Sequence, residues 1–359
     1  MKKNGFVLGK FMPPHIGHLA LLRFAKEHCE HLTVLVESRL DEPMSASIRA
    51  QWIHEALYGD PHIRVVALEG EHPQAPPLVN PEPFWEHWHD IIQQYCPNLD
   101  VLISSEDYGK KLALDQGVEW ISLDRTIIPT SGTMVRDNPW ERWWDLIEPA
   151  RRCLVKRVVV MGPESTGKSV LSQHLANLSP TVSVPEYAAD WIARNPDRTL
   201  GETELRHFFK SQMALVHAYA SQANRWLVED SHPVTTSVWA EYLGFHQLRK
   251  EIDDWCQTQT PPDLILLTHP QGSIWVEDVH RKQQTDQDWF FNAFEERLQH
   301  LKWNYTIIQG NWQNRTRQAE DVVLKSIQQW KTQPLAIWME KTPQTNPHLP
   351  SKPSIKTSI

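Results

Sequence analysis

The sequence predicts an α/β fold with two tandem three-layer domains, each built around a parallel sheet. Short apolar segments alternate with helix-like segments in two successive series, as is typical of parallel strands joined by crossover helices. The chain has 359 residues, more than twice the length of a typical domain of about 150 residues. Ligands bind such sheets at the carboxyl ends of the strands, so a site is expected in the turns that follow the predicted strands.

Residues 1–150 carry the first series. Its expected strands are residues 5–9, 32–36, 63–67, 101–104 and 119–123, with helix-like segments between them, including residues 83–95 and 107–115. A Pro-rich stretch from Glu71 to Pro81 interrupts the alternation. A loop this long inside a compact domain is often a lid or a substrate-binding loop.

Residues 151–330 carry the second series. Its expected strands are residues 156–161, 181–184, 226–229, 263–267 and 305–308, and residues 202–223 are expected to form a long helix. From about Lys331 onward, five prolines stand among Thr, Ser, Gln and Lys residues. Because such a stretch does not readily sustain a helix or strand, we expect residues 331–359 to form a flexible tail.

The composition excludes several classes of protein. With 40% apolar and 22% charged residues, the chain resembles a folded globular protein and not a disordered one. Its net charge of −8 argues against a nucleic-acid partner, which needs a basic surface. No apolar run approaches the length of about 18 residues that spans a membrane, so we expect a cytoplasmic protein without a membrane partner. The four cysteines form no Cys-x-x-Cys pair, which favours reduced thiols over disulfides or a zinc site.

The first candidate site follows the first predicted strand. There Gly9, Lys10 and Phe11 lead into His15-Ile16-Gly17-His18 at the start of a helical pattern. The amino terminus of a helix favours an anion, and histidines three residues apart can donate hydrogen bonds to the same phosphoryl group. The alternative is a capped helix with two surface histidines.

The second part of this site lies at residues 129–136, just after the last strand of the first series. Ser131 and Thr133 open a helix there, and Arg136 lies one turn further along. Hydroxyl groups at a helix start and a guanidinium group both bind phosphate oxygens. Taken alone, this segment is an ordinary N-cap. This segment follows the histidine loop, residues 9–18, in the chain. The two motifs in this order are a more specific signal than either motif alone.

Together these motifs resemble the nucleotidyltransferases that carry His-x-Gly-His and a later Ser-x-Thr-x-x-Arg, and within them the NadR-type nicotinamide mononucleotide (NMN) adenylyltransferases. Residues 84–88, 104–107, 124–126 and 131–140 also resemble that family in order and spacing. The resemblance implies that residues 1–150 form a Rossmann-like domain in which the phosphate of NMN attacks the α-phosphorus of ATP. Pyrophosphate leaves and NAD is the product.

The resemblance also implies roles for individual residues. His15, His18 and Arg136 would be catalytic, the histidines stabilising the α-phosphate and Arg136 the departing phosphates. Trp85 or Trp88 would stack on the nicotinamide ring, whichever of them does not face the core. The remaining ligand-binding residues would be Gly9, Lys10, Phe11, Ser131 and Thr133.

A second candidate site follows the strand expected at residues 156–161. Residues 162–169 read Gly-Pro-Glu-Ser-Thr-Gly-Lys-Ser, which is a P-loop between a strand and a helix. Backbone amides of the loop would surround the β-phosphate of ATP, Lys168 would reach the β and γ oxygens, and Ser169 would bind Mg²⁺. The loop residues expected to bind ATP are Gly162, Glu164, Ser165, Thr166, Gly167, Lys168 and Ser169.

Three further residues are candidates for the second site. Asp230 ends a predicted strand, where a carboxylate helps to hold Mg²⁺. Glu186 follows another strand and would bind or deprotonate a ribose hydroxyl, unless it is an ordinary acid at a helix start. Arg281 lies in a polar stretch and would close over the γ-phosphate, unless that stretch is a solvated charge cluster.

These segments resemble the nicotinamide riboside kinase half of the NadR family, so residues 151–330 are expected to be a P-loop kinase domain. The family tends to show Asp-x-Asp where this chain reads Asp230-Ser231-His232, so the resemblance to an active kinase is weaker at this position. Some members also carry an N-terminal helix-turn-helix domain. Here the first predicted strand begins at residue 5, so we expect none.

The leading hypothesis is a two-headed NAD salvage enzyme that uses ATP and Mg²⁺ and acts on nicotinamide riboside and NMN. One alternative is a coenzyme A synthase-like fusion of an adenylyltransferase and a kinase. The other is a nucleotide-sensing regulator with an inactive kinase half. The sequence leaves the formation of a homo-oligomer open.

Overall fold

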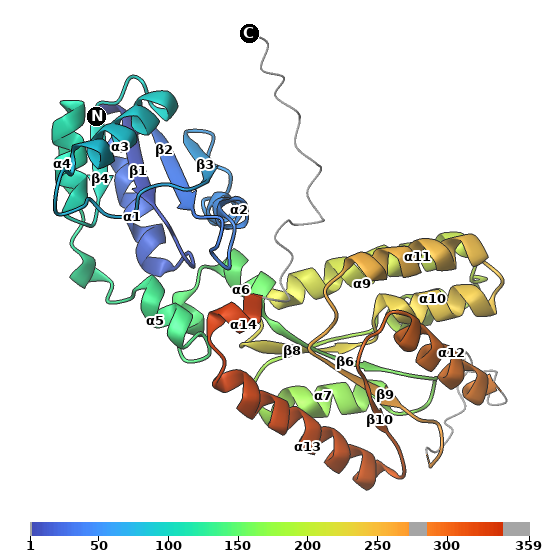
Figure 1. The fold of residues 1–359 in the computed structure, drawn as a ribbon. Helices are drawn as coiled ribbons and strands as arrows, with labels where there is room; N and C mark the ends of the chain where they lie inside the picture. Colours follow the sequence, from blue (N-terminus) through green and yellow to red (C-terminus); the bar gives the residue numbers. More distant parts are fainter. Residues whose placement is uncertain (1, 273–285, 340–359) are drawn as a thin grey trace. The chain divides into compact units, whose positions relative to one another are not determined.

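The computed structural model describes residues 2–272 and 286–339 and divides into two compact units. Unit 1 comprises Met1–Ala150 together with the chain from Pro334 onward, and unit 2 comprises Arg151–Gln333. Each unit contains a five-stranded sheet whose strands pair in parallel (Figure 1). The predicted fold class, two parallel-sheet α/β domains in tandem, is confirmed.

The sheet of unit 1 has the strand order β3-β2-β1-β4-β5, so β1 lies at its centre. Its strands are β1 (Lys2–Gly9), β2 (Cys29–Ser38), β3 (Ile63–Glu69), β4 (Val101–Ser104) and β5 (Glu119–Ser122). Its helices are α1 (Ile16–Glu27), α2 (Ala46–Ala56), α3 (Glu82–Tyr95), α4 (Tyr108–Gln116), α5 (Gly132–Asp137), the short 3₁₀ helices η1 (Arg125–Ile127) and η2 (Trp143–Asp145), and α14 (Leu335–Met339). Helix α6 (Glu148–Leu154) crosses the boundary between the units.

Helices pack on the unit 1 sheet as the apolar alternation requires. Helices α3 and α4 contribute Trp88, Ile92 and Leu112 to a core that includes Phe6 of β1 and Leu102 of β4. Helices α1 and α2 pack against β2 and β3. This packing fixes the carboxyl end of β1, where the histidine loop begins.

The sheet of unit 2 has the order β10-β9-β6-β8-β7, which again places the first strand of the unit at the centre. Its strands are β6 (Lys156–Met161), β7 (Val182–Val184), β8 (Trp226–Asp230), β9 (Leu264–Thr268) and β10 (Thr306–Ile308). Its helices are α7 (Lys168–Leu178), α8 (Tyr187–Arg194), α9 (Glu202–Ala220), α10 (Pro233–Tyr242), α11 (His246–Thr258), α12 (Gln287–His300) and α13 (Trp312–Lys331).

Helices cover both faces of the unit 2 sheet (Figure 1). Helices α9 to α12 pack on Val159 and Met161 of β6, and α7 and α13 lie together on the other side. A strand buried on both faces has no polar side to present, which explains the uninterrupted run Val158-Val159-Val160.

The prediction of a flexible tail from about Lys331 is wrong for residues 331–339. Helix α13 continues to Lys331, and α14 follows with Leu335, Trp338 and Met339 each at most 2% exposed. Trp338 lies against Trp140 and Trp143 of unit 1, with ring centroids 6.4 and 6.1 Å apart. Burial of these apolar side chains outweighs the effect of the prolines on chain propensity. The remainder of the predicted tail, residues 340–359, lies outside the described residues.

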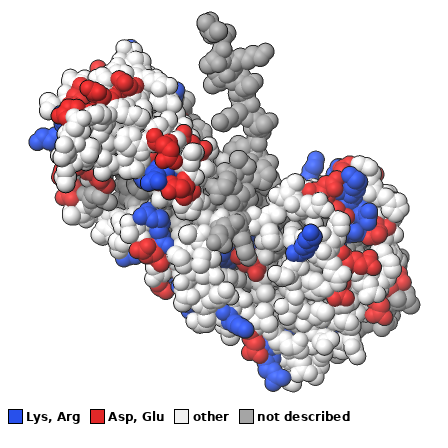
Figure 2. Space-filling view, viewed as in Figure 1, with Lys and Arg blue, Asp and Glu red and all other residues white. Residues whose placement is uncertain are grey.

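Charge on the face drawn in Figure 2 is mixed in sign. On the face drawn in Figure 2, the described Lys and Arg side chains are interspersed with Asp and Glu and do not form one continuous basic surface. Within residues 2–272 and 286–339, no helix has the length and apolar character needed to span a membrane.

Candidate active sites

The first candidate site begins where β1 turns into α1. His15 is the N-cap of α1: its Nδ1 accepts a hydrogen bond from the backbone N–H of His18 at 3.4 Å, and Nδ1 of His18 accepts one from the N–H of His15 at 3.3 Å. The two rings stack with centroids 3.6 Å apart. Since each Nδ1 is an acceptor, the proton of each neutral ring lies on Nε2. Two parallel imidazole donors are therefore fixed at the start of a helix.

The loop before α5 joins this site through the side chain of Arg136. Nη1 of Arg136 donates to the carbonyl oxygen of Met12 at 2.5 Å, and Nη2 donates to Oγ1 of Thr133 at 3.0 Å. Ser131 is the N-cap of α5 and accepts from the N–H of Met134. A Cβ on Gly132 would lie 2.6 Å from the Met12 carbonyl oxygen, so the two loops are in close contact. The fold thus brings together the two motifs that the sequence separates.

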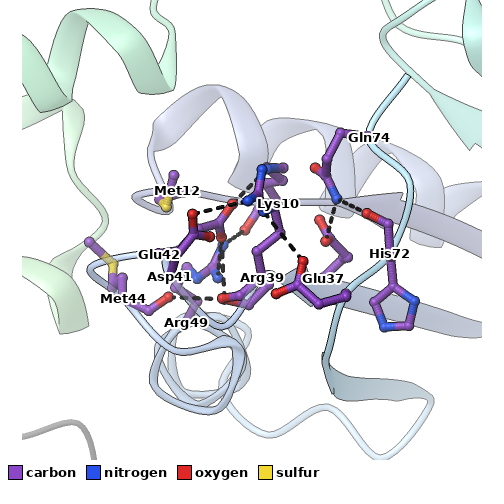
Figure 3. A network of polar contacts seen from close by, with 12 residues as sticks. Lys10, Met12, Glu37, Arg39, Asp41, Glu42, Met44, Arg49, His72 and Gln74 are labelled. Carbon is purple, nitrogen blue, oxygen red and sulfur yellow. Dashed lines mark hydrogen bonds and ion pairs between the residues drawn. The ribbon is translucent and has the colours of Figure 1, made fainter. Parts of the chain in front are cut away.

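Lys10 lies in a polar network at the end of the sheet (Figure 3). Its Nζ forms an ion pair with Glu42 at 2.5 Å, and Glu42 also accepts from Nη2 of Arg49 at 3.0 Å. Burial tends to raise the pKa of Glu42, but the hydrogen bond from Lys10 and the charge of Arg49 outweigh burial and lower it. Glu42 is therefore ionised at neutral pH. Lys10 remains a predicted phosphate ligand, and it would have to exchange this partner to act as one.

Phe11 and Gly9 form the start of the same loop. The Phe11 backbone has φ of +50°. Its buried ring packs against the backbone of Gly9 and lies edge-on to the His18 ring, with ring centroids 4.9 Å apart. Phe11 therefore supports the His18 ring from one side.

The two candidate stacking residues differ in their surroundings. Trp88 is 5% exposed, belongs to the core of unit 1, and donates from Nε1 to the carbonyl oxygen of Pro73 at 3.2 Å. Its ring faces are covered by protein, which corrects the prediction that it stacks on a ligand. Trp85 is only partly buried, with the ammonium group of Lys111 5.8 Å from its ring, and stays a prediction.

The Pro-rich loop is anchored to the sheet at its beginning. Nε2 of Gln74 donates to Oε1 of the buried Glu37 at 2.8 Å, and Nδ1 of His72 lies 3.0 Å from Nε2 of His87 (Figure 3 shows Gln74, Glu37 and His72). Further along, Leu78 and Val79 are exposed. The loop is therefore held at its beginning, close to the carboxyl end of β2.

The second candidate site is the P-loop between β6 and α7. Gly162 has φ of +142°, and a Cβ there would lie 2.6 Å from the carbonyl oxygen of Thr268. Gly167 has φ of +82° and is the N-cap of α7. Thr166 and Lys168 both donate to the carbonyl oxygen of Pro163, at 2.8 and 2.9 Å. The loop is thus closed around itself, with glycines where other residues would be strained or blocked.

Asp230 is the last residue of β8 and faces this loop. It forms a hydrogen bond with Ser169, and its Oδ1 is buried without a partner among the described residues. Burial raises the pKa of Asp230, opposed by the charge of Lys168 and the bond to Ser169. Its neighbour Glu229 pairs instead with Arg157 at 2.5 and 3.0 Å. Alternation along the strand therefore directs only one of these two carboxylates toward the P-loop.

A cavity of about 840 Å³ opens beside the P-loop. Glu186 lines it from the start of α8 and makes no capping hydrogen bond there. Gln212, on α9, accepts from the N–H of Tyr187 at 2.8 Å and so holds the turn that carries Glu186. Glu186 therefore lines the cavity beside the P-loop, and its contact with a ribose hydroxyl stays a prediction.

His232, where the family tends to have a carboxylate, also lines this cavity. It is the N-cap of α10, and its Nδ1 accepts from the N–H of Val234 at 3.3 Å. Burial and the positive charge of Arg157 hold its pKa well below the ordinary value. His232 therefore takes over the hydrogen-bonding role of an N-cap carboxylate without its negative charge.

Sequence reasoning missed Arg315, a residue of α13 that is 2% exposed and lines the cavity. Its guanidinium donates to the carbonyl oxygens of Thr166 at 3.0 Å, Gly310 at 2.6 Å and Gln271 at 3.0 Å. Arg315 thereby ties the P-loop to two loops that follow other strands. Arg281, the predicted mobile arginine, lies outside the described residues.

Comparisons with known proteins agree with this division. Residues 6–153 match the cytidylyltransferase-like family, and residues 157–315 match an AAA domain family. The chain is 27% identical over 329 residues to the trifunctional NAD biosynthesis/regulator protein NadR of Salmonella typhimurium, a match that covers 83% of this chain and 76% of the relative. The NadR protein of Escherichia coli is 26% identical over 330 residues, covering 83% and 77%. The chain is a NadR homologue.

Solved structures of NadR proteins share its fold. A NadR protein in complex with NR has a TM-score of 0.72 at 20% identity, and the match covers 90% of this chain and 96% of that one. A NadR protein in complex with NAD and AMP-PNP has a TM-score of 0.68 at 21% identity, with the same coverage. The shared fold therefore extends over both units.

Proposed function

We propose that unit 1 transfers the adenylyl group of ATP to nicotinamide mononucleotide, giving NAD and pyrophosphate. The observation that carries this proposal is the junction of the two sequence motifs, with Arg136 bonded to the carbonyl of Met12 beside the stacked rings of His15 and His18. The NadR relatives, whose names include NAD biosynthesis, support the choice of substrate.

The proposed mechanism uses positioning and charge without a covalent intermediate. An oxygen of the NMN phosphate attacks the α-phosphorus of ATP in line, and the bond to the β-phosphate oxygen breaks. The Nε2–H groups of His15 and His18 donate to α-phosphate oxygens, whose charge grows in the transition state. Ser131, Thr133 and Arg136 hold the departing pyrophosphate, for which a guanidinium group has matching geometry.

We propose that unit 2 phosphorylates nicotinamide riboside with ATP, supplying NMN to unit 1. The P-loop with Lys168 would bind the triphosphate, and Glu186 would bind a ribose hydroxyl in the adjoining cavity. A NadR structure that contains NR supports this substrate.

The residues beside the P-loop fit a Mg²⁺ ion. Ser169 offers a hydroxyl oxygen and Asp230 a carboxylate with a buried oxygen that has no partner among the described residues. Mg²⁺ prefers oxygen ligands and is commonly held by one or two carboxylates together with phosphates and water. The ion would offset the negative charge between the β- and γ-phosphates. One carboxylate suffices for this, so the neutral His232 does not preclude kinase activity.

The test is a stepwise assay of the purified protein with ATP and Mg²⁺. With NMN as the second substrate we expect NAD and an equal amount of pyrophosphate, and with nicotinamide riboside we expect NMN to appear before NAD. Failure to form NAD from NMN would refute the unit 1 assignment. NMN turnover without riboside turnover would indicate an adenylyltransferase with an inactive kinase half, and turnover of phosphopantetheine and dephospho-coenzyme A instead would indicate the coenzyme A synthase alternative.

A further inference from the structure

Two guanidinium groups hold the backbone of the loop that leads to His15. Arg136 donates to the carbonyl of Met12 from α5, and Arg49 donates from Nη1 to the carbonyl of Lys10 from α2. The two carbonyls are two residues apart, and the chain between β1 and α1 is thus fixed from two different helices. Arg136 belongs to the proposed phosphate site, whereas Arg49 is not part of it.

Arg49 is fully buried and every part of its guanidinium group is used. Nη1 donates to Lys10, Nε donates to the carbonyl oxygen of Ser45 at 3.1 Å, and Nη2 donates to Glu42 at 3.0 Å. The group therefore links the start of α2, the loop after β2 and the loop after β1 (Figure 3). With all three nitrogens engaged below the surface, Arg49 does not itself face a ligand.

The cost of burying this charge argues against a role in stability alone. A buried ion pair such as Arg49 and Glu42 is often no more stabilising than well-packed apolar side chains of similar volume. What an apolar pair lacks is a donor to hold the Lys10 carbonyl in place. Arg49 thus differs from an apolar substitute in the hydrogen bond that it donates to the backbone of the histidine loop.

We infer that Arg49 is a positioning residue for adenylyl transfer, fixing the backbone from Lys10 to His15 so that the two imidazoles meet the α-phosphate. Glu42 is its counterion and orients the guanidinium group. This inference rests on the proposed function of unit 1. Because a misplacement of about 1 Å can cost a factor of about 100 in rate, a residue two contacts away from the phosphate can have a large effect.

The first variant is Arg49→Lys, which keeps the charge but offers one nitrogen where the guanidinium offers three. We expect kcat for NAD formation from NMN to fall roughly 100-fold while KM for NMN and ATP changes less than about threefold, because the lost interaction acts in the transition state. Arg64→Lys is the matched control. Arg64 is an exposed arginine of β3 that also donates to a carbonyl, that of Tyr95, and we expect it to leave kcat unchanged.

The double variant Glu42→Met/Arg49→Met covers the case in which Arg49→Lys fails to fold. It removes both buried charges and keeps apolar volume, so we expect folded protein whose kcat is as low as that of Arg49→Lys. Phosphorylation of nicotinamide riboside by unit 2 serves as the internal reference in every preparation. Wild-type kcat in either folded variant, or a raised KM with unchanged kcat, would overturn the inference.

An additional readout separates this inference from the proposed reaction. Imidazole signals of His15 and His18 in ¹H–¹⁵N spectra, assigned by substitution, should shift in Arg49→Lys and stay in place in Arg64→Lys. If the wild type forms no NAD, the proposed function fails, and the spectra still decide whether Arg49 positions the histidine loop. Unchanged histidine signals in Arg49→Lys would reject the positioning role.

Discussion

The two candidate sites occupy equivalent places and are built in different ways. Each follows the central strand of a five-stranded parallel sheet, β1 in unit 1 and β6 in unit 2, where the strand turns into a helix. In unit 1 the turn presents side chains, the stacked imidazoles, and Arg136 of α5 is bonded to it. In unit 2 it presents backbone amides, shaped by Gly162 and Gly167, with a single ammonium group.

This difference determines which substitutions should impair each site. A loop that works through side chains must be held in place by other side chains, which is the part that Arg49 and Arg136 play in unit 1. A loop that works through its backbone depends first on its own conformation, although Thr268, Gln287 and Arg315 also form hydrogen bonds with the P-loop. We therefore expect unit 1 to be sensitive to distant side chains and unit 2 to be sensitive to its glycines.

The largest expected effects are on single activities: one substitution should abolish one reaction and leave the other unchanged. Lys168→Ala should lower riboside phosphorylation by at least about 1,000-fold, because the ammonium group that meets the β and γ oxygens is lost. His18→Ala should do the same to NAD formation from NMN. Each variant should keep the other activity within about twofold in separate assays of the two steps. A variant that silences both steps would show that the two sites are not independent.

Gly162→Ala tests the dependence of unit 2 on its backbone. The new Cβ would lie 2.6 Å from the carbonyl oxygen of Thr268, so we expect the P-loop to distort and phosphorylation to fall at least about 100-fold. Gly244→Ala is the control. Gly244 also has a positive φ but no atom within 4 Å of the added carbon, so only a strain of about 1 kcal/mol is expected. Equal activities of these two variants would contradict the role given to the Gly162 contact.

Trp338→Ala tests whether α14 is part of unit 1. Removal of this buried ring should lower the free energy of unfolding of unit 1 by about 3–5 kcal/mol and leave unit 2 unchanged. Hydrogen exchange of the β1 and β6 amides reports on the two units separately. Trp144→Ala removes a tryptophan that is 52% exposed and should have a much smaller effect. Faster exchange in β6 and not in β1 would show that α14 stabilises unit 2, and it would contradict the place of α14 in unit 1.

The smallest effect concerns pH. His232 is neutral in the folded state because burial and Arg157 lower its pKa well below the value of about 6.5 in an unfolded chain. Below about pH 6.5 the unfolded state therefore binds more protons, and unit 2 loses stability as the pH falls, by up to about 1.4 kcal/mol per pH unit. Above that pH this contribution is fully present.

His232→Asn keeps an acceptor for the Val234 N–H and removes the titrating group. The unfolding free energy of the wild type minus that of this variant, followed by hydrogen exchange in β6, should decrease as the pH is lowered from 7.5 to about 5.5. Other groups that titrate in this range cancel in the difference. A constant difference would show that His232 is not the source of the pH dependence.

The fold and the P-loop could be predicted because their signals are local. A buried parallel strand is a continuous apolar run, and the P-loop needs its glycines and lysine within eight residues. The histidine site was found by the order of two short motifs. Arg49 and Arg315 escaped prediction because each donates to a carbonyl far away in the chain, and no sequence motif marks the helices α2 and α13 that carry them.

The other corrections, for Trp88 and for α14, depend on tertiary packing, which a sequence pattern does not show. Trp85 and Trp88 lie on one helix, and only the packing of α3 on the sheet decides that Trp88 is in the core. For α14, the prolines suggested a tail, although Leu335, Trp338 and Met339 have the spacing of one helical face. That spacing was a usable signal, but five residues are too few for a helix without tertiary contacts.

Because α14 completes unit 1 from beyond unit 2, the order of synthesis matters. During translation, residues 1–150 leave the ribosome long before Trp338 is synthesised. Until then, Trp140 and Trp143 lack the ring that packs against them in the folded protein. A nascent chain that stalls within unit 2 would carry an incompletely packed unit 1, open to proteases. Full-length synthesis thereby becomes a condition for a stable first unit.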